Sequence, residues 1–269
     1  MFKQLNKIKE YYFLFRKSKT HQYLKKFRTL RKLKIAYRKV KFLYSTPYPF
    51  HNDIFFQKVL ILIINYIKPT TIIETGTFLG TGTSFMAKNF PKIPIYTCEI
   101  NNAYYKKSKK NLRKCFNVKI IKETSTKFLQ NMIDKKLFEK TPLFFLDAHW
   151  ENYWPLEDEI KIITDNCKSA VILIDDFKVP DSPQFGFDTY KLADCSLKLI
   201  KPKMNKKNEY NLLFPNYDIK DFPNGKIKVG LTGYPIIFMN LSKEFEKLLT
   251  NPFVKKYFVD KSGLLKRKK

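Results

Sequence analysis

The sequence predicts an α/β fold in which a mostly parallel sheet is flanked by helices. Short apolar runs of strand length alternate with helical segments from about residue 51 onward. A glycine-rich loop follows the first of these runs, and two later runs end at acidic residues. Such alternation is typical of βαβ units, in which successive strands pair in parallel.

The composition is that of a folded, strongly basic chain. Its 269 residues suit one large α/β domain plus an extension, and 44% hydrophobic residues suffice for a core. The four cysteines form no CxxC pair, so we expect neither a zinc cluster nor a disulfide framework, and we predict a cytoplasmic location. No apolar run reaches the roughly 18–20 residues needed to span a bilayer. The net charge of +28 is explained either by an anionic partner or by compositional drift.

The positive charge is concentrated at the N-terminus. Residues 1–45 hold fifteen Lys and Arg but a single acid, Glu10, and apolar side chains recur among them at helical spacing. We therefore predict a basic helical extension over residues 1–48, followed by a second domain over residues 49–269. Three roles stay open for the extension. It could attach the protein peripherally to an anionic membrane, bind nucleic acid or an anionic glycan, or pack on the domain and pair subunits into an oligomer.

The elements of the second domain follow in order. Each predicted strand is a short run rich in Ile, Val, Leu, Phe and Tyr, as expected of a buried strand. The predicted strands cover residues 71–74, 95–99, 118–121, 143–146, 170–174 and 233–239. The predicted helices cover residues 53–67, 82–89 and 155–166, with a lysine-rich helix between the second and third strands.

The loop after the first strand has the features of a cofactor site. Residues 74–83 read Glu-Thr-Gly-Thr-Phe-Leu-Gly-Thr-Gly-Thr, and glycine lets the backbone turn sharply and approach a ligand. The following helix offers free N–H groups at its N-terminus. About twenty residues further on, Glu99 ends the second strand, where a carboxylate can accept both ribose hydroxyls of an adenosine cofactor.

The glycine spacing separates two kinds of adenosine cofactor. A nicotinamide dinucleotide site would use G-x-G-x-x-G to hold a pyrophosphate. Here Gly76 and Gly80 are four residues apart, and the acid Glu74 precedes them. That acid suits a cofactor with cationic sulfonium and ammonium groups and no phosphate. The remaining alternative is a tight strand–helix turn that binds no ligand.

On these residues, the segment from about 70 to 240 resembles class I S-adenosylmethionine-dependent methyltransferases. Their first motif, E/D-x-G-x-x-x-G, is matched by the loop, and their second-strand acid is matched by Glu99. The resemblance implies a Rossmann-like, doubly wound, mostly parallel seven-stranded sheet with a late antiparallel strand. It also implies S-adenosylmethionine as cofactor, with an adenine contact just after the third strand. The implied cofactor-binding residues are Glu74, Gly76, Thr77, Gly80, Glu99 and Ser125.

Three acids stand at the ends of later strands. Asp147 closes the fourth strand, and Asp175 and Asp176 follow the fifth. If these strands are neighbours, as in the resembling family, the carboxylates converge beside the cofactor. Crowded carboxylates repel, and an all-oxygen cluster favours Mg²⁺, Mn²⁺ or Ca²⁺, which would lower the pKa of an acceptor hydroxyl. This pattern resembles metal-dependent O-methyltransferases that act on sugars and catechols. The alternative is that the acids cap the following helices.

The residues after the fourth strand depart from that pattern. His149 is a candidate base or fourth metal ligand, so Asp147 and His149 are the candidate catalytic residues. The alternative for His149 is a local hydrogen bond. Trp150, Tyr153 and Trp154 are suited either to stacking on a sugar ring or to packing in the core.

The sequence therefore predicts methyl transfer from S-adenosylmethionine to an oxygen of a small hydroxylated or glycan acceptor, such as a sugar, assisted by a divalent metal. The alternative is a nucleic-acid-binding protein or RNA methyltransferase, supported by the charge and the basic N-terminus. The signature Asn/Asp-Pro-Pro-Tyr/Phe of N-methyltransferases is missing after the fourth strand, where Asp-Ala-His-Trp stands instead. That absence disfavours methylation of an amine.

Overall fold

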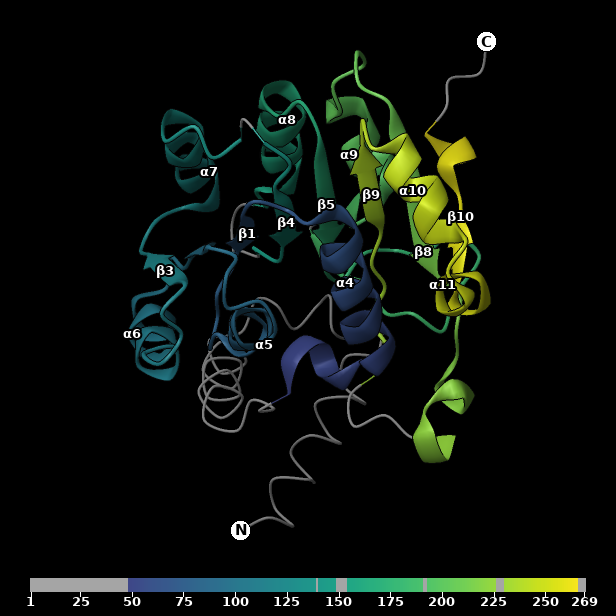
Figure 1. Ribbon diagram of the computed structural model, residues 1–269, viewed down its shortest axis with the longest axis horizontal. Coiled ribbons are helices and arrows are strands. Elements are labelled where there is room, and N and C mark those ends of the chain that lie inside the picture. The colour runs from purple at the N-terminus through teal and green to yellow at the C-terminus, as the bar shows by residue number, and fades with distance from the viewer. Residues whose placement is uncertain (1–47, 139, 149–153, 191–192, 226–229, 266–269) are drawn as a thin grey trace, which may run out of the picture. The chain divides into compact units, whose positions relative to one another are not determined.

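The chain divides into two compact units, Met1–Pro47 and Tyr48–Lys269. The computed structural model describes most of the second unit, namely residues 48–138, 140–148, 154–190, 193–225 and 230–265 (Figure 1). Of the predicted basic extension only its last residue is described, and His149, Trp150 and Tyr153 also lie outside the described residues. Within the described part, no helix combines the length and the apolar character needed to cross a membrane.

Eight strands form the central sheet. In chain order they are β1 (Ile72–Thr75), β2 (Ile95–Cys98), β3 (Val118–Ile121), β4 (Leu143–Leu146), β5 (Ala170–Ile174), β8 (Tyr210–Pro215), β9 (Ile236–Met239) and β10 (Phe258–Asp260). Their order across the sheet is β10-β8-β9-β5-β4-β1-β2-β3. The strands β1 to β5 pair in parallel, whereas β9 is antiparallel to both β5 and β8. The predicted doubly wound sheet with a late antiparallel strand is confirmed, and the edge strand β10, antiparallel to β8, makes the strand count eight rather than seven. A separate hairpin pairs β6 (Thr189–Tyr190) with β7 (Ala193–Asp194).

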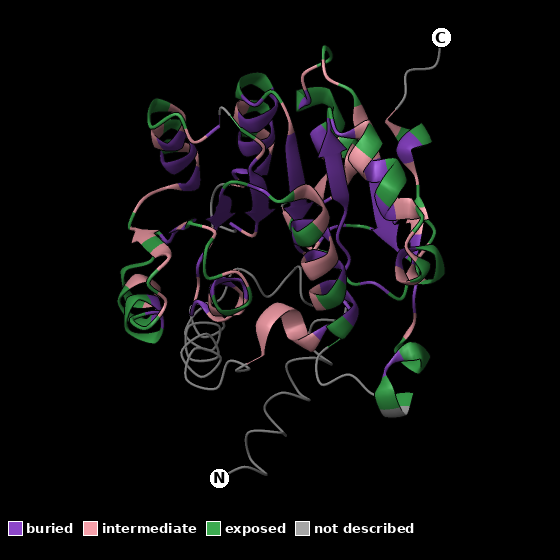
Figure 2. Ribbon diagram, viewed as in Figure 1, coloured by how far each residue is buried: buried purple, intermediate pink, exposed green. Residues whose placement is uncertain are grey.

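The central strands are buried along their whole length. Every residue of β1, β4, β5 and β9 is buried, which explains their nearly continuous apolar sequences. At the sheet edge, β3 is only partly buried and exposes Lys119. Figure 2 shows this contrast between the buried strands and the helices, whose outer sides are exposed.

Helices cover both faces of the sheet. They are α4 (Ile54–Ile67), α5 (Thr81–Asn89), α6 (Asn102–Asn111), α7 (Ser125–Asp134), α8 (Leu156–Asn166), α9 (Leu197–Ile200), α10 (Ser242–Leu249) and α11 (Pro252–Tyr257). Because crossovers between parallel strands are right-handed, α5 and α6 cover one face, and α7 and α8 cover the other. The helices α7 and α8 pack on each other, and α4 packs on α10 (Figure 1).

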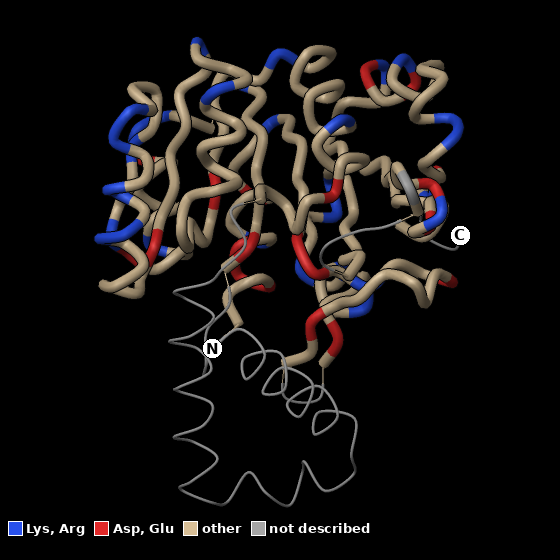
Figure 3. The backbone as a smooth tube through the Cα atoms, turned by 90° about the horizontal axis from the view of Figure 1, so that it is seen from below, with Lys and Arg blue, Asp and Glu red and all other residues tan. Residues whose placement is uncertain are grey.

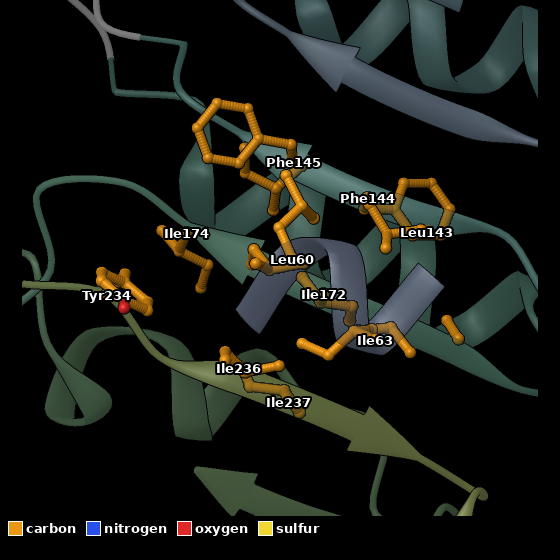
Figure 4. Packing of buried hydrophobic residues seen from close by; sticks show 14 of the residues in the cluster. Leu60, Ile63, Leu143, Phe144, Phe145, Ile172, Ile174, Tyr234, Ile236 and Ile237 are labelled. Carbon is orange, nitrogen blue, oxygen red and sulfur yellow. The ribbon is translucent and has the colours of Figure 1, made fainter. Parts of the chain in front are cut away.

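The helix α4 closes the core beside the central strands. Its N-cap is Asp53, whose carboxylate accepts hydrogen bonds from the amides of Phe55 and Phe56. Leu60 and Ile63 are fully buried and lie against the side chains of β4, β5 and β9 (Figure 4). Burying each of these aliphatic side chains contributes about 1.5–3 kcal/mol to folding. This packing fixes α4, and with it the residues just before it, relative to the strand ends.

Candidate active site

The candidate site lies where the strand order reverses. From β1 the chain builds outward through β2 to β3, whereas β4 pairs on the other side of β1 and leads to β5. In open α/β sheets, ligands bind outside the carboxyl ends of the strands at this switch point. The glycine loop follows β1, Glu99 follows β2, Asp147 follows β4 and Asp175 follows β5, so all of them lie at the same edge of the sheet.

Backbone hydrogen bonds fix the register of β1, β4 and β5 at their carboxyl ends. The amide of Asp147 donates to the carbonyl of Thr75 at 2.9 Å, and the amide of Asp175 donates to the carbonyl of Leu146 at 3.0 Å. The sheet pairing therefore extends one residue beyond β4 and β5. As a result, the two acids start from adjacent, fixed backbone positions.

The glycine loop passes very close to the end of β4. Gly76 has a φ of 90°, and a Cβ at this position would collide with the carbonyl oxygen of Asp147. Gly80 caps α5 with a φ of 76°, and a Cβ there would lie 2.7 Å from Cδ1 of Leu112. Both positions thus require glycine for conformation, and Gly76 also requires it for space because its neighbour is backbone. The loop thus makes the sharp turn that its glycines predicted.

The side chain of Glu74 connects the glycine loop to its neighbouring elements. Its side chain is buried, and its Oε2 accepts hydrogen bonds from the hydroxyls of Thr83 at 2.5 Å and Thr97 at 2.6 Å. Since Thr97 uses its proton on Glu74, the hydroxyl of Thr77 is the donor in the 2.6 Å contact between Thr77 and Thr97. Burial raises the pKa of Glu74 to about 7. The carboxylate therefore ties β1 to both α5 and β2.

Glu99 joins the loop to the end of β2. Its Oε2 accepts the amide of Phe78 and its Oε1 accepts the amide of Asn101, both at 2.8 Å. Burial raises the pKa of Glu99 above its usual value. Each carboxylate oxygen keeps a second lone pair, so two further donors, such as a pair of ribose hydroxyls, can be accommodated.

Two buried hydroxyls beside the loop have no hydrogen-bond partner among the described residues. Ser125 is the first residue of α7 and is only 1% exposed, and Thr75 is the last residue of β1. Leaving a buried hydroxyl unpaired costs about 1–3 kcal/mol. Such groups at the carboxyl ends of β1 and β3 are suited to a bound polar ligand.

A second cluster forms beyond β5. Asp176 has a φ of 49°, so the chain turns between Asp175 and Asp176 and both carboxylates can reach the same point. The third member is His51, from the short 3-10 helix η1 (Pro49–Asn52) that precedes α4. Ligand atoms of these three side chains all lie within 4.8 Å of one another, and His51 Nε2 is 3.5 Å from Asp175 Oδ2. Among the described residues, Asp147 is not a member of this group.

Negative charge dominates this cluster. The hydrogen bond to Asp175, together with the charges of Asp175, Asp176 and Asp147, raises the pKa of His51 to about 9 against the opposing effect of burial. Burial and the charges of Asp175 and Asp147 raise the pKa of Asp176 to about 8. Asp147 also raises the pKa of Glu74 and Glu99, so its carboxylate acts on both groups of acids. Figure 3 marks the acidic and basic residues along the backbone.

His51 is held by an unusual backbone segment. Phe50, His51 and Asn52 have φ values of 50°, 54° and 66°, a left-handed conformation that costs roughly 1–2 kcal/mol for a residue such as Phe or His. The ring of Phe50 packs on Phe85 and Phe145, with centroids 5.5 and 5.3 Å apart. This packing fixes the turn. Sequence reasoning missed His51, because nothing in the local pattern signals a left-handed turn before α4.

A small cavity opens beside the cluster. It lies at the carboxyl ends of β4 and β5, and Asp175 and Trp154 are among the residues that line it. The indole of Trp154 lies 6.1 Å from the ring of Tyr190. The indole of Trp154 thus lines the same cavity as Asp175.

A doubly wound sheet, the loop E-x-G-x-x-x-G at its switch point and an acid after β2 together define a class I methyltransferase. The sequence model of the O-methyltransferase family matches residues 18–175, more than half of the chain, and the chain belongs to this family. It is therefore an S-adenosylmethionine-dependent enzyme that methylates oxygen.

Solved structures with a similar fold include two ligand complexes. One is the O-methyltransferase from Bacillus cereus in complex with SAH, with 16% identity, 68% of this chain and 79% of that chain covered, and a TM-score of 0.49. The other is the O-methyltransferase TomG from Streptomyces achromogenes, involved in tomaymycin synthesis, in complex with SAM, with 14% identity, coverage of 68% and 78%, and a TM-score of 0.48. No curated protein matches the chain. The assignment therefore rests on the family match.

Proposed function

We propose that the enzyme transfers the methyl group of S-adenosylmethionine to a hydroxyl of a small hydroxylated acceptor, such as a sugar, with the help of a divalent metal. The observation that supports this proposal is that Asp147, Asp175 and Asp176 follow the adjacent strands β4 and β5, at the edge that bears the glycine loop and Glu99. Glu99, proposed to bind the cofactor, and the three aspartates, proposed to bind a cation, therefore lie at the same edge of the sheet.

For the cofactor, the proposed contacts follow from the donors and acceptors present. The spare lone pairs of Glu99 would accept the ribose hydroxyls, and the unpaired hydroxyl of Ser125 would face the adenine. Gly76, Thr77 and Gly80 would let the loop backbone lie against the ligand. Glu74 would stabilise the conformation of this loop, since its carboxylate already accepts hydrogen bonds from two threonines.

For the metal, the donor set fits a hard divalent cation. Carboxylate oxygens of Asp147, Asp175 and Asp176 are the ligand type that Mg²⁺ and Mn²⁺ prefer. Such an ion, when bound, lowers the pKa of an acceptor hydroxyl. Asp147 would orient the acceptor toward the methyl donor, because its charge acts on both the cofactor acids and the second cluster.

For the acceptor, the indole of Trp154, which lines the same small cavity as Asp175, supports a ring-shaped molecule that would stack outside this cavity. Planar aromatic side chains offer a face on which a sugar can stack. The test is transfer of an isotopically labelled methyl group to a panel of sugars, nucleotide sugars, catechols and RNA. Labelled sugar supports the proposal, whereas labelled RNA alone would replace it with the nucleic-acid alternative.

A further inference from the structure

We propose that His51 is a direct ligand of the divalent metal, so that the site combines a nitrogen donor with carboxylates and prefers Mn²⁺ or Co²⁺ to Mg²⁺. This inference rests on the metal in the proposed function. It adds a residue that lies far from the family motifs in sequence. The structure brings this residue to Asp175 and Asp176 through the turn before α4.

The distances suit one shared ion. Metal–ligand bonds of about 2.1 Å place neighbouring ligand atoms of an octahedral ion about 3 Å apart and opposite ones about 4.2 Å apart. Nε2 of His51 lies 3.5 Å from Oδ2 of Asp175, and all three side chains offer ligand atoms within 4.8 Å of one another. These separations are close to those that a shared octahedral ion requires.

The backbone presents the imidazole from a fixed position. On one side of His51, the ring of Phe50 packs on Phe56 with a centroid distance of 4.6 Å. On the other side, Asp53 caps α4 and accepts a 2.5 Å hydrogen bond from the hydroxyl of Tyr217. A ligand whose neighbours are locked in this way loses little freedom when it binds a metal.

The nitrogen donor has a consequence for metal choice. Carboxylate and water ligands suit Mg²⁺, Ca²⁺ and Mn²⁺, whereas imidazole favours later transition metals, and affinity rises from Mn²⁺ to Co²⁺ for a given site. A site completed by His51 should therefore bind Co²⁺ more tightly than Mg²⁺ by a wider margin than a site of carboxylates alone.

The decisive variant is His51→Asn. Asparagine tolerates the left-handed backbone at this position and replaces the imidazole nitrogen with an amide oxygen. Calorimetric titration of the full-length, metal-free protein should show Co²⁺ affinity falling by about tenfold or more, while Mg²⁺ affinity changes much less. Asn52→Gly is the matched control, because it alters the same left-handed turn without touching a ligand, and it should leave both affinities unchanged.

A spectroscopic readout begins with the wild-type protein. Pulsed electron paramagnetic resonance of Mn²⁺ bound to the wild-type protein should show modulation from a coordinated histidine nitrogen. This modulation should disappear in His51→Asn and persist in His149→Asn, which removes the other histidine considered for this site. Loss of the modulation in His149→Asn alone would overturn the assignment.

The outcomes separate this inference from the proposed function. If the wild-type protein binds no divalent ion at all, the metal part of the proposed function fails together with the inference. If it binds Co²⁺ and Mg²⁺ but His51→Asn has the same affinities, or the Mn²⁺ spectrum shows no nitrogen, the metal stands and the role of His51 is refuted.

Discussion

Replacing Gly76 with alanine tests the reasoning about the switch point. The added methyl group would collide with the carbonyl oxygen of Asp147, which is backbone and cannot rotate away. Gly76 also has a φ of 90°, where an L-residue is strained. The collision can be relieved only if the ends of β1 and β4 move apart.

The magnitude follows from these two contributions. A non-glycine residue in a left-handed conformation costs roughly 1–2 kcal/mol. Separating the strand ends weakens the hydrogen bonds from Asp147 to Thr75, at 2.9 Å, and from Gly76 to Cys98, at 3.0 Å, each worth about 0.5–1.5 kcal/mol. Gly76→Ala should therefore lower the free energy of unfolding by about 3 kcal/mol and weaken S-adenosylmethionine binding.

Gly225→Ala is the matched control for this measurement. Gly225 has a φ of 57°, but a Cβ there meets no atom of the described residues within 4 Å, so this variant serves as the control for backbone strain. Urea unfolding of both variants gives the difference that is due to the collision. If Gly76→Ala costs no more than Gly225→Ala, the close approach of the loop to β4 is refuted.

Three further predictions concern single side chains. Glu99→Ala should weaken S-adenosylmethionine binding by about 1.5–3 kcal/mol through lost charge-assisted hydrogen bonds, and unchanged binding by calorimetry would contradict the ribose assignment. Tyr217→Phe should lower stability in urea by about 1.5–3 kcal/mol, because the hydroxyl donates to the buried carboxylate of Asp53, whereas an unchanged midpoint would show that this contact contributes nothing. Burial raises the pKa of Glu74 from 4.5 to about 7, so its contribution to stability is complete below pH 4.5 and is lost as the pH rises through 7. Stability of the wild type should thus fall by about 3 kcal/mol more than that of Glu74→Gln between pH 4.5 and 7.5, and parallel pH profiles would refute the shifted pKa.

Much of the sheet could be predicted because its strands are continuous apolar runs. The strands at residues 118–121, 143–146 and 170–174 have the predicted bounds. The helix expected to begin at residue 53 begins at Ile54, because Asp53 is its N-cap.

The elements that were missed depend on distant partners or on a mixed sequence. β8 is stabilised by pairing with β9 and β10 from the end of the chain, and β10 is only three residues long. α7 was missed because its polar residues obscure the buried positions, although Phe128, Leu129 and Met132 follow helical spacing.

Some residues of the candidate site could also be predicted from the sequence, and others could not. Gly76, Glu99, Asp147 and Asp175 could be predicted because each follows a strand of the parallel sheet, whose ends must meet at one edge. His51 could not be predicted, because its position depends on three left-handed residues and on packing across the fold. The contact between His51 and the aspartates after β5 joins two segments that are far apart in the sequence, and no periodic pattern of residues indicates it.

The most direct test of the metal-assisted reaction is labelled methyl transfer to the best sugar acceptor before and after exhaustive chelation. We predict that transfer is lost on chelation and restored by a divalent cation. Asp147→Asn should abolish transfer while S-adenosylmethionine binding, measured by calorimetry, stays largely intact. Full activity after chelation would contradict the metal-assisted mechanism and leave base catalysis to a histidine.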